Sequence, residues 1–200
     1  MYIPKHFEQN NHQKSIAFMR AYNFAIVVSV KNNIPIATHL PFVIEERENE
    51  LVLVSHLSKA NEQHKTFLEN DVLVIFSEPH AYISPTLYEK QQNVPTWNYV
   101  SVHAYGKVKL FNTDEEKLQV LQKQMQFFEA SYIEQFKTLD QKYIDGLLKG
   151  IVAFEIVVTD LQSKEKLSQN KTNSERENIR KHLEKSNDTT QQAIGKMMSQ

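Results

Sequence analysis

The stretch SHLSKAN combines side chains that could hold an anion. An apolar run ends at His56, and Ser58 and Lys59 follow it directly. A hydroxyl, an ammonium and the backbone amides of a helix that begins here would together suit a phosphate group. The same residues are also typical of a plain helix start, with Ser58 or Asn61 as its cap. Both interpretations stay open on local sequence alone.

A second polar cluster, KEKLSQNK, occupies residues 164–171 directly after a strand-like run. Lys166 and Lys171 flank three smaller polar side chains, Ser168, Gln169 and Asn170. This mixture can donate many hydrogen bonds to an anionic or carbonyl-rich ligand. A solvated loop that leads into the last helices is the alternative interpretation.

The only tryptophan of the chain, Trp97, lies in the stretch VPTWNYVSVHAY. It stands at the start of a long β pattern, among a proline, an asparagine, two tyrosines and a histidine. A flat aromatic side chain here is either a core residue or the wall of a pocket for a planar ligand.

Several classes of catalytic site lack the residues they need. The absence of cysteine excludes disulfides, thiolate metal sites and a cysteine nucleophile. No P-loop or dinucleotide-binding glycine pattern is present. The eight histidines show no HExxH or HxH spacing, so single histidines bonded to backbone are expected rather than a metal site. The acidic runs EERENE (45–50) and DEE (114–116) are interpreted as solvated helical or turn segments, and we expect no catalytic residue.

Composition points to an ordinary globular protein. The 200 residues are 40% hydrophobic and 24% charged, with a formal net charge of -1. This balance gives no global electrostatic case for nucleic-acid binding, and no DNA-reading motif is seen, so DNA as a partner is left open. Without an apolar leader or a run of membrane-spanning length, we expect a cytoplasmic protein with no membrane partner.

Hydrophobic periodicity predicts many strands and a few helices. Strands are expected at 24–30, 34–42, 50–57, 72–77, 81–84, 97–111 and 151–161, the first three as an antiparallel meander. Helices are expected at 11–22, behind the capping box Thr113–Glu116, near 139–149, and behind a second box at Ser174–Glu177.

These elements predict a single mainly β (α+β) domain spanning residues 1–200. Strands this close together leave no room for the crossover helices of a parallel sheet, which favours a small β-barrel with peripheral helices. The barrel is expected at about 22–161, inserted helices at about 113–149, and a helical C-terminal extension at about 172–200.

Seven stretches occur along the chain in an order typical of one family: MYIPKHF, ATHLPF, SHLSKAN, IFSEPHAYISPTLY, VPTWNYVSVHAYG, GIVAFEI and KLSQNK. They resemble the PaiB family of FMN-binding-type negative transcriptional regulators, from residue 1 to about 185. The resemblance implies an FMN-binding split β-barrel of the flavin-reductase type, related to the pyridoxamine phosphate oxidase fold. Such proteins usually form homodimers with flavin sites between the subunits.

The resemblance also implies an FMN site. The residues expected beside the isoalloxazine are Thr38, His39, Leu40 and Pro41. Those expected to face the phosphate or ribityl chain are His56, Ser58, Lys59 and Asn61. Part of the wall would come from Ser84, Trp97 and Asn98, and the site would be closed by Lys166, Ser168 and Gln169.

Three positions depart from the family pattern. Lys59 stands where arginine is more usual, Glu62 replaces a proline, and Leu87 replaces a common tryptophan. Lysine makes no bidentate phosphate contact, and Glu62 adds negative charge nearby, so weaker FMN binding is expected.

Two functions follow from the resemblance. The first is a PaiB-like negative transcriptional regulator, a repressor whose barrel binds FMN at a homodimer interface. The alternative is a flavin-dependent oxidoreductase that uses FMN with a nicotinamide or other reductant. A haem-handling barrel is a third option, since histidine-bearing split barrels of that kind exist.

Overall fold

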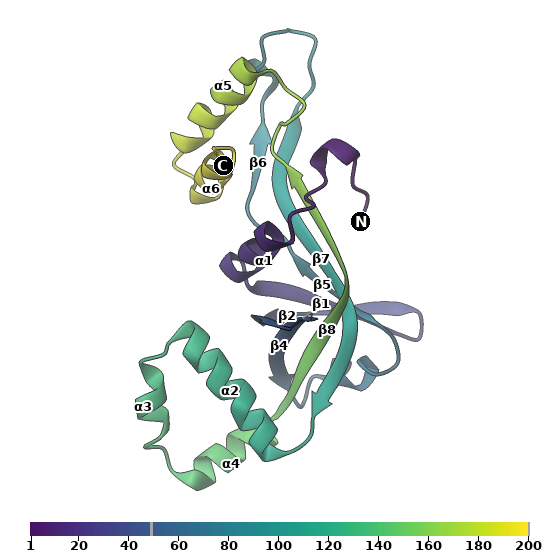
Figure 1. Ribbon diagram of the computed structural model, residues 1–200, viewed down its shortest axis with the longest axis vertical. Helices are drawn as coiled ribbons and strands as arrows, with labels where there is room; N and C mark the ends of the chain where they lie inside the picture. Colours follow the sequence, from purple (N-terminus) through teal and green to yellow (C-terminus); the bar gives the residue numbers. More distant parts are fainter. Residues whose placement is uncertain (49, 200) are drawn as a thin grey trace. The chain divides into compact units, whose positions relative to one another are not determined.

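A computed structural model describes residues 1–48 and 50–199. Its strands are β1 (Phe24–Lys31), β2 (Ile34–Pro41), β3 (Val43–Arg47), β4 (Glu50–Ser58), β5 (Val72–Phe76), β6 (His80–Ile83), β7 (Thr96–Phe111) and β8 (Ile151–Lys166). The α-helices are α1 (His12–Ala21), α2 (Asp114–Phe128), α3 (Tyr132–Phe136), α4 (Gln141–Lys149), α5 (Asn173–Glu184) and α6 (Thr189–Met197) (Figure 1). Three short 3₁₀ helices are η1 (Lys5–Phe7), η2 (Glu62–Thr66) and η3 (Pro85–Leu87). Within these described ranges, no helix is long and apolar enough to cross a membrane.

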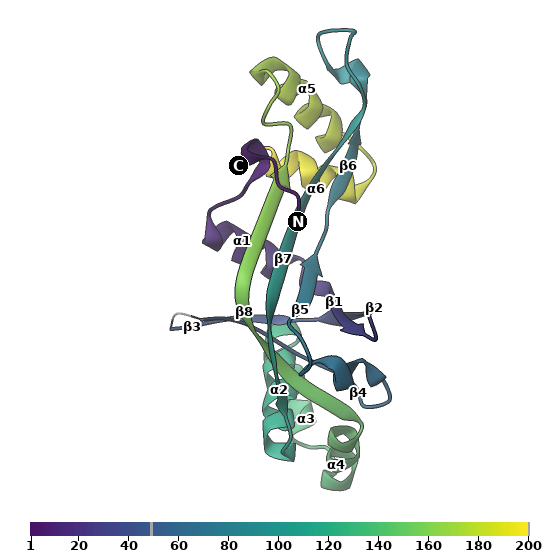
Figure 2. The ribbon, with the colours of Figure 1, turned by 90° about the vertical axis from the view of Figure 1, so that its right-hand side faces the viewer.

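The eight strands form one sheet in the order β2-β1-β5-β7-β8-β4-β3, with β6 paired to β7. The mainly β, α+β prediction is therefore confirmed. The predicted meander of the first three strands is wrong, because β4 pairs with β3 on one side and β8 on the other. Only β1 and β2 form the expected hairpin, and β5 lies on the other side of β1 (Figure 2).

The turn between β1 and β2 follows from its sequence. Asn32 and Asn33 both have positive φ, 53° and 64°, and they connect the paired residues Lys31 and Ile34. Two left-handed residues in a two-residue loop match the right-handed twist of a hairpin, and asparagine tolerates that conformation well. This turn fixes the register that places Thr38 opposite Val27.

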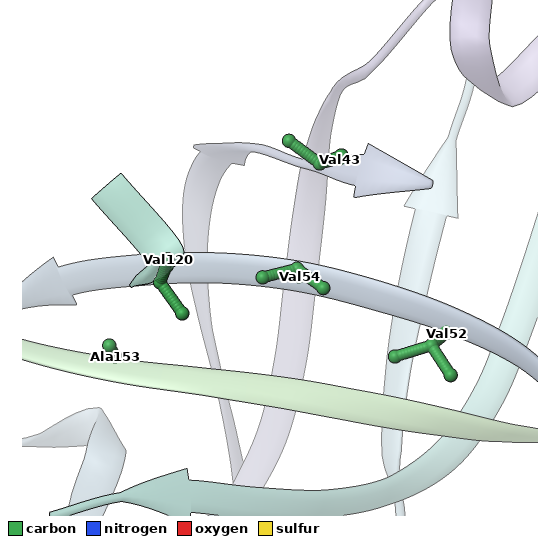
Figure 3. Close-up of a cluster of buried hydrophobic side chains, with 5 residues drawn as sticks. All are labelled: Val43, Val52, Val54, Val120 and Ala153. Carbon is green, nitrogen blue, oxygen red and sulfur yellow. The ribbon is translucent and has the colours of Figure 1, made fainter. Parts of the chain in front are cut away.

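Strand β3 was missed because its charges suggested a turn. The residues Glu45–Arg47 belong to a strand that pairs antiparallel with β4, not to a helical or turn segment. On one face of this hairpin, a buried cluster joins the strands to α2 and β8: Val43, Val52, Val54, Val120 and Ala153 (Figure 3). The cluster buries apolar surface from four elements and holds α2 against β4.

Helices α2, α3 and α4 occupy the interval predicted for inserted helices. Thr113 and Glu116 form the predicted capping box at the start of α2. Phe136, Ile144 and Leu148 are the buried centre on which the remaining apolar side chains of these helices pack.

Near the C-terminus, helix α5 begins two residues earlier than predicted. Thr172, not Ser174, caps α5, and its side chain and that of Glu175 exchange hydrogen bonds with each other's backbone amides. The pattern Ser/Thr-x-x-Glu occurs twice in overlapping positions here, so the sequence could not choose between them. Helix α6 packs beside α5 and β6 (Figure 1).

The chain contains two compact units. Unit 1 comprises 1–15, 77–102 and 162–200, and unit 2 comprises 16–76 and 103–161. Strands β7 and β8 contribute residues to each unit. The boundaries predicted for a single split-barrel domain stay a prediction.

Candidate functional site

In unit 2, Thr38 and Asn61 are brought together by hydrogen bonds. The Asn61 side-chain amide donates to Thr38 Oγ1 at 2.9 Å, and the Thr38 hydroxyl donates to Gln63 Oε1. The Asn61 side-chain oxygen, Oδ1, caps η2 by accepting a hydrogen bond from the Gln63 backbone amide. Asn61 is thus the cap that the sequence offered as one of two choices, and it is tied to the strand that carries Thr38.

Gln63 is the residue at the centre of this group, and no sequence motif indicates it. Its side chain is 4% exposed, and its Nε2 lies 3.1 Å from Val27 O, Ser29 Oγ and Ile36 O. A polar residue just inside a short helix gives no signal that separates it from solvated neighbours. Its partners lie on β1 and β2, so only the folded pairing shows its role.

The other residues predicted beside the isoalloxazine alternate along β2. His39 is exposed and its ring stacks on Phe24, with centroids 6.2 Å apart. Leu40 is buried, and the carbonyl of Pro41 accepts a hydrogen bond from the Ser55 hydroxyl at 2.7 Å. Only Thr38 and His39 therefore offer polar side chains on this strand.

The backbone amides of the turn that carries Ser58 and Lys59 already donate hydrogen bonds within the protein. Lys59 N donates to Gly150 O, Ala60 N to Ser58 Oγ, and Asn61 N to Ser58 O. A phosphate at this turn would therefore meet side chains, not a cradle of free amides. Both Ser58 and Lys59 are exposed, and Lys59 makes no ion pair with any residue of 1–48 or 50–199.

The charge of Glu62 is balanced within its own surroundings. Its carboxylate lies 2.6 Å from Lys65 Nζ and 3.6 Å from Lys31 Nζ. The hydrogen bond from Lys65 lowers the pKa of Glu62, and the charges of both lysines lower it further. The repulsion of a nearby phosphate that the sequence suggested is therefore weakened.

His56 is engaged by α2. Its Nδ1 lies 2.6 Å from Gln124 Oε1, while Gln124 Nε2 is buried without a partner among the described residues. Burial lowers the pKa of His56, and the hydrogen bond to Gln124 opposes that shift. This nitrogen is therefore occupied within the protein, and any ligand contact would have to come from the other ring nitrogen.

Unit 1 holds the remaining predicted residues, with Trp97 on its surface. Trp97 is 50% exposed and is paired across the strands with Tyr82, itself 48% exposed. The two rings meet edge to face with centroids 5.8 Å apart, and the His80 ring lies 5.6 Å from Trp97. Trp97 is thus a surface residue and not a core residue.

Asn98 and Ser168 form a buried pair behind this surface. Asn98 is 0% exposed and accepts a hydrogen bond from the Ser168 hydroxyl at 3.0 Å. Its amide donates to the sulfur of Met198, a weak acceptor. Ser168 has a φ of 61°, a left-handed conformation that places its side chain in this contact. Both residues therefore shape the site from within.

The last three predicted residues differ in what they can offer a ligand. The Gln169 side chain accepts a hydrogen bond from Leu167 N and donates one to Glu165 O, so it is bound within its own turn. Ser84 caps η3. Lys166 donates to Thr96 Oγ1 from a half-buried position.

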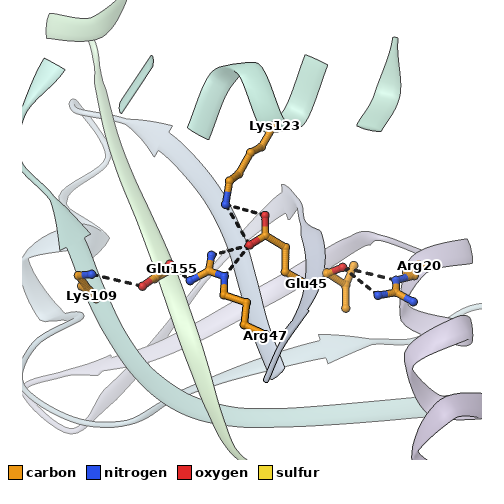
Figure 4. Close-up of polar contacts among 7 residues, drawn as sticks. Arg20, Glu45, Arg47, Lys109, Lys123 and Glu155 are labelled. Atoms are coloured by element: carbon orange, nitrogen blue, oxygen red, sulfur yellow. Dashed lines mark hydrogen bonds and ion pairs between the residues drawn. The ribbon is translucent and has the colours of Figure 1, made fainter. Parts of the chain in front are cut away.

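A groove in unit 2 lies away from all these residues. Its volume is about 770 Å³, and its lining includes Val43, Phe127 and Ile133 together with charged side chains. Glu45 and Lys123 at its edge belong to an ion-pair chain that continues through Arg47 to Glu155 and Lys109 (Figure 4). These charges are paired among themselves, so the groove shows no converging free group for chemistry.

The two groups of residues have the chemistry that a flavin mononucleotide needs. An exposed hydroxyl and an unpaired ammonium at Ser58 and Lys59 suit a phosphate monoester. Amide and hydroxyl groups at Thr38 and Asn61 suit the polar edge of the ring. These residues of unit 2 therefore fit FMN. In unit 1, the exposed indole of Trp97 is by itself a surface that suits a flat ring.

Comparison with known proteins supports the same ligand. Residues 1–160 match the sequence model of the family described as "Putative FMN-binding domain". The chain is 36% identical over 201 residues to the protease synthase and sporulation protein PAI 2 of Bacillus subtilis, covering 99% of this chain and 96% of that protein. The family match confirms the predicted cofactor class.

Solved structures confirm the predicted split-barrel fold. The flavocytochrome Anf3 from Azotobacter vinelandii superimposes with a TM-score of 0.64 at 17% identity, over 82% of this chain and 72% of that one. An FAD and heme binding protein from Mycobacterium smegmatis gives a TM-score of 0.61 at 15% identity, over 80% and 73%. At these identities the likeness concerns the fold alone.

Proposed function

The chain belongs to the FMN-binding family of PaiB-like proteins, and from this premise we propose that it is a negative transcriptional regulator that binds FMN. The observation that carries the proposal is the match to PAI 2 over nearly the whole chain. The exposed Ser58 hydroxyl and Lys59 ammonium add, on this chain itself, two side chains that suit the phosphate of FMN. In this proposal, bound flavin sets whether the protein represses its target genes in the cytoplasm.

The roles of the individual residues follow from their surroundings. Ser58 and Lys59 hold the phosphate, because their side chains are exposed and no ion pair with a described residue competes for Lys59. Thr38 and Asn61 present fixed polar groups to the ligand, because Gln63 holds them in one arrangement. When bound, FMN supplies one- and two-electron redox chemistry, and the protein residues bind and orient it.

We also propose that the protein acts as a homodimer with FMN at the interface. Support comes from the family resemblance. The mass of the purified protein in solution tests this directly.

A flavin-dependent oxidoreductase is the second candidate. The observation in its favour is the open aromatic surface at Trp97 and Tyr82, which leaves space for a second planar molecule. Turnover of a nicotinamide reductant by the FMN-loaded protein would favour this candidate over the regulator.

Deletion of the gene in its host, followed by transcript measurement, tests the regulatory role. We expect a defined set of transcripts, including genes for degradative enzymes, to rise on deletion and to return to normal with the wild-type gene. A Lys59→Met gene should restore repression only partly if FMN controls it. Unchanged transcripts on deletion would refute the regulatory function and leave the oxidoreductase.

A further inference from the structure

Helix α2 holds the ring of His56 in a fixed place. Residues two apart on a strand point to the same side, so Val54, His56 and Ser58 share one side of β4. On that side, Val54 belongs to the buried cluster that includes Val120 of α2 (Figure 3). Gln124 lies one turn further along α2, and its Oε1 is 2.6 Å from His56 Nδ1. Within residues 1–48 and 50–199, the other ring nitrogen, Nε2, has no hydrogen-bond partner.

The proton of the contact with Gln124 belongs to the imidazole. A glutamine Oε1 can only accept a hydrogen bond, so Nδ1 of His56 carries the hydrogen and donates it. Gln124 is 7% exposed, so little water competes for this oxygen. Burial lowers the pKa of His56, and the hydrogen bond to Gln124 opposes that shift without cancelling it. The ring is therefore neutral at neutral pH, with its proton on Nδ1 and a bare lone pair on Nε2.

A bare lone pair on Nε2 decides which part of a flavin can face His56. Phosphate oxygens are negatively charged at neutral pH and accept hydrogen bonds, so they repel this nitrogen. A hydroxyl group can donate to it. His56 and Ser58 lie about 6.6 Å apart along β4. When the phosphate of FMN is held at Ser58, the hydroxylated ribityl chain next to that phosphate is within reach of His56.

We propose that Gln124 is a positioning residue that fixes His56 as the hydrogen-bond acceptor for a ribityl hydroxyl of the flavin. The inference rests on the proposed flavin site, and it assigns His56 to the chain of the ligand and not to its phosphate. It also gives the site a means of selecting flavins by that chain. FMN and riboflavin carry the hydroxyl groups, whereas lumiflavin has a methyl group in place of the whole chain.

The first experiment locates the proton in the flavin-free protein. Proton–nitrogen NMR correlation spectra distinguish the Nδ1–H and Nε2–H tautomers of neutral histidines, and the signals that disappear in His56→Phe identify His56. Well above the ordinary histidine pKa of about 6.5, we expect the Nδ1–H tautomer. Gln124→Met should shift His56 to the Nε2–H tautomer that free histidine prefers. Gln122→Met, the same change at an exposed position of α2, should leave the tautomer unchanged.

The second experiment compares the affinities of FMN, riboflavin and lumiflavin. His56→Phe should weaken FMN and riboflavin by the same factor, about fivefold, which corresponds to one neutral hydrogen bond. The ratio of the two affinities should stay as in the wild type, because the phosphate contacts at Ser58 and Lys59 are untouched. Lumiflavin affinity should not change. Gln124→Met should weaken FMN and riboflavin together, and Gln122→Met should weaken neither.

Three results would overturn the proposal. An Nε2–H tautomer in the wild-type protein would remove the acceptor on which it depends, and this measurement needs no variant to fold. A loss in His56→Phe confined to FMN would place His56 on the phosphate, and an equal loss for lumiflavin would place it on the ring. Thermal melting shows which variants are folded and fit for comparison.

Failure of the proposed function gives a different result. If none of the three flavins binds the wild-type protein, the flavin site itself is refuted, and the contact with the ribityl chain falls with it. The three results above refute the role of Gln124 and His56 alone, since FMN still binds in each of them.

Discussion

Replacement of Gln63 by methionine should destabilise the protein and loosen the proposed flavin site. Methionine keeps the approximate volume and shape of glutamine, so a cavity contributes little. It removes the donor to Val27 O, Ser29 Oγ and Ile36 O and the acceptor for the Thr38 hydroxyl. The amide NH2 has two hydrogens for its three acceptors, so these contacts amount to three hydrogen bonds. At roughly 1 kcal/mol for each buried hydrogen bond, the free energy of unfolding should fall by about 3 kcal/mol.

Urea denaturation, followed by Trp97 emission or circular dichroism, measures that change. The matched control is Gln122→Met, the same substitution at an exposed glutamine of α2, where we expect a change below about 0.5 kcal/mol. A second measurement, FMN affinity under conditions where the variant is folded, should show about a tenfold loss, because Thr38 and Asn61 lose their common partner.

The reasoning would be refuted by a Gln63→Met protein that unfolds at the same urea concentration as the control. A stable variant with unchanged FMN affinity would mean that the buried amide neither holds the two strands nor positions the ligand group. Loss of stability with unchanged affinity would refute only the positioning role.

Three further predictions concern the surrounding structure. Arg47→Met should lower the free energy of unfolding by about 2 kcal/mol, since it removes the closest partner of the Glu155 carboxylate, whose side chain is 7% exposed. A change below about 0.5 kcal/mol in chemical denaturation would contradict this. Burial lowers the pKa of His56 below 6.5, so as the pH falls the unfolded chain takes up the proton first and the folded state loses stability. His56→Gln should therefore lose less melting temperature than the wild type between about pH 7.5 and 5.5. An equal loss in variant and wild type would exclude the effect. Thr172→Ala should cost about 1 kcal/mol and Ser174→Ala much less, and the reverse order in thermal melts would mean that the other capping box forms.

The strands with alternating or continuous apolar residues could be predicted from the sequence, because their pattern is local. Strand β3 could not, because Glu45 and Arg47 look like a solvated turn until β4 and Glu155 supply their long-range partners. Strand β8 continues to Lys166 for a similar reason. Its last lysines appear polar in the sequence, yet they lie among Tyr2, Tyr99 and other rings brought in from distant segments.

The sequence predicts candidate site residues only where they belong to a short motif. The resemblance placed Thr38 beside the isoalloxazine, Asn61 near the phosphate or ribityl chain and Trp97 in the wall, and these roles stay predictions. The sequence could not find Gln63, whose role depends on carbonyl groups of β1 and β2, nor the occupation of the amides around Lys59. It also gave no reason to single out Lys164, whose ammonium lies over the rings of Tyr2 and Tyr99.

Titration of the purified protein with FMN, followed by flavin fluorescence, tests the central claim most directly. We predict saturable binding in the micromolar range or tighter, with riboflavin, which lacks the phosphate, at least about tenfold weaker. Lys59→Met should reduce FMN affinity to that of riboflavin. Absence of saturable binding up to hundreds of micromolar, or equal affinity for FMN and riboflavin, would contradict a flavin phosphate site at Ser58 and Lys59.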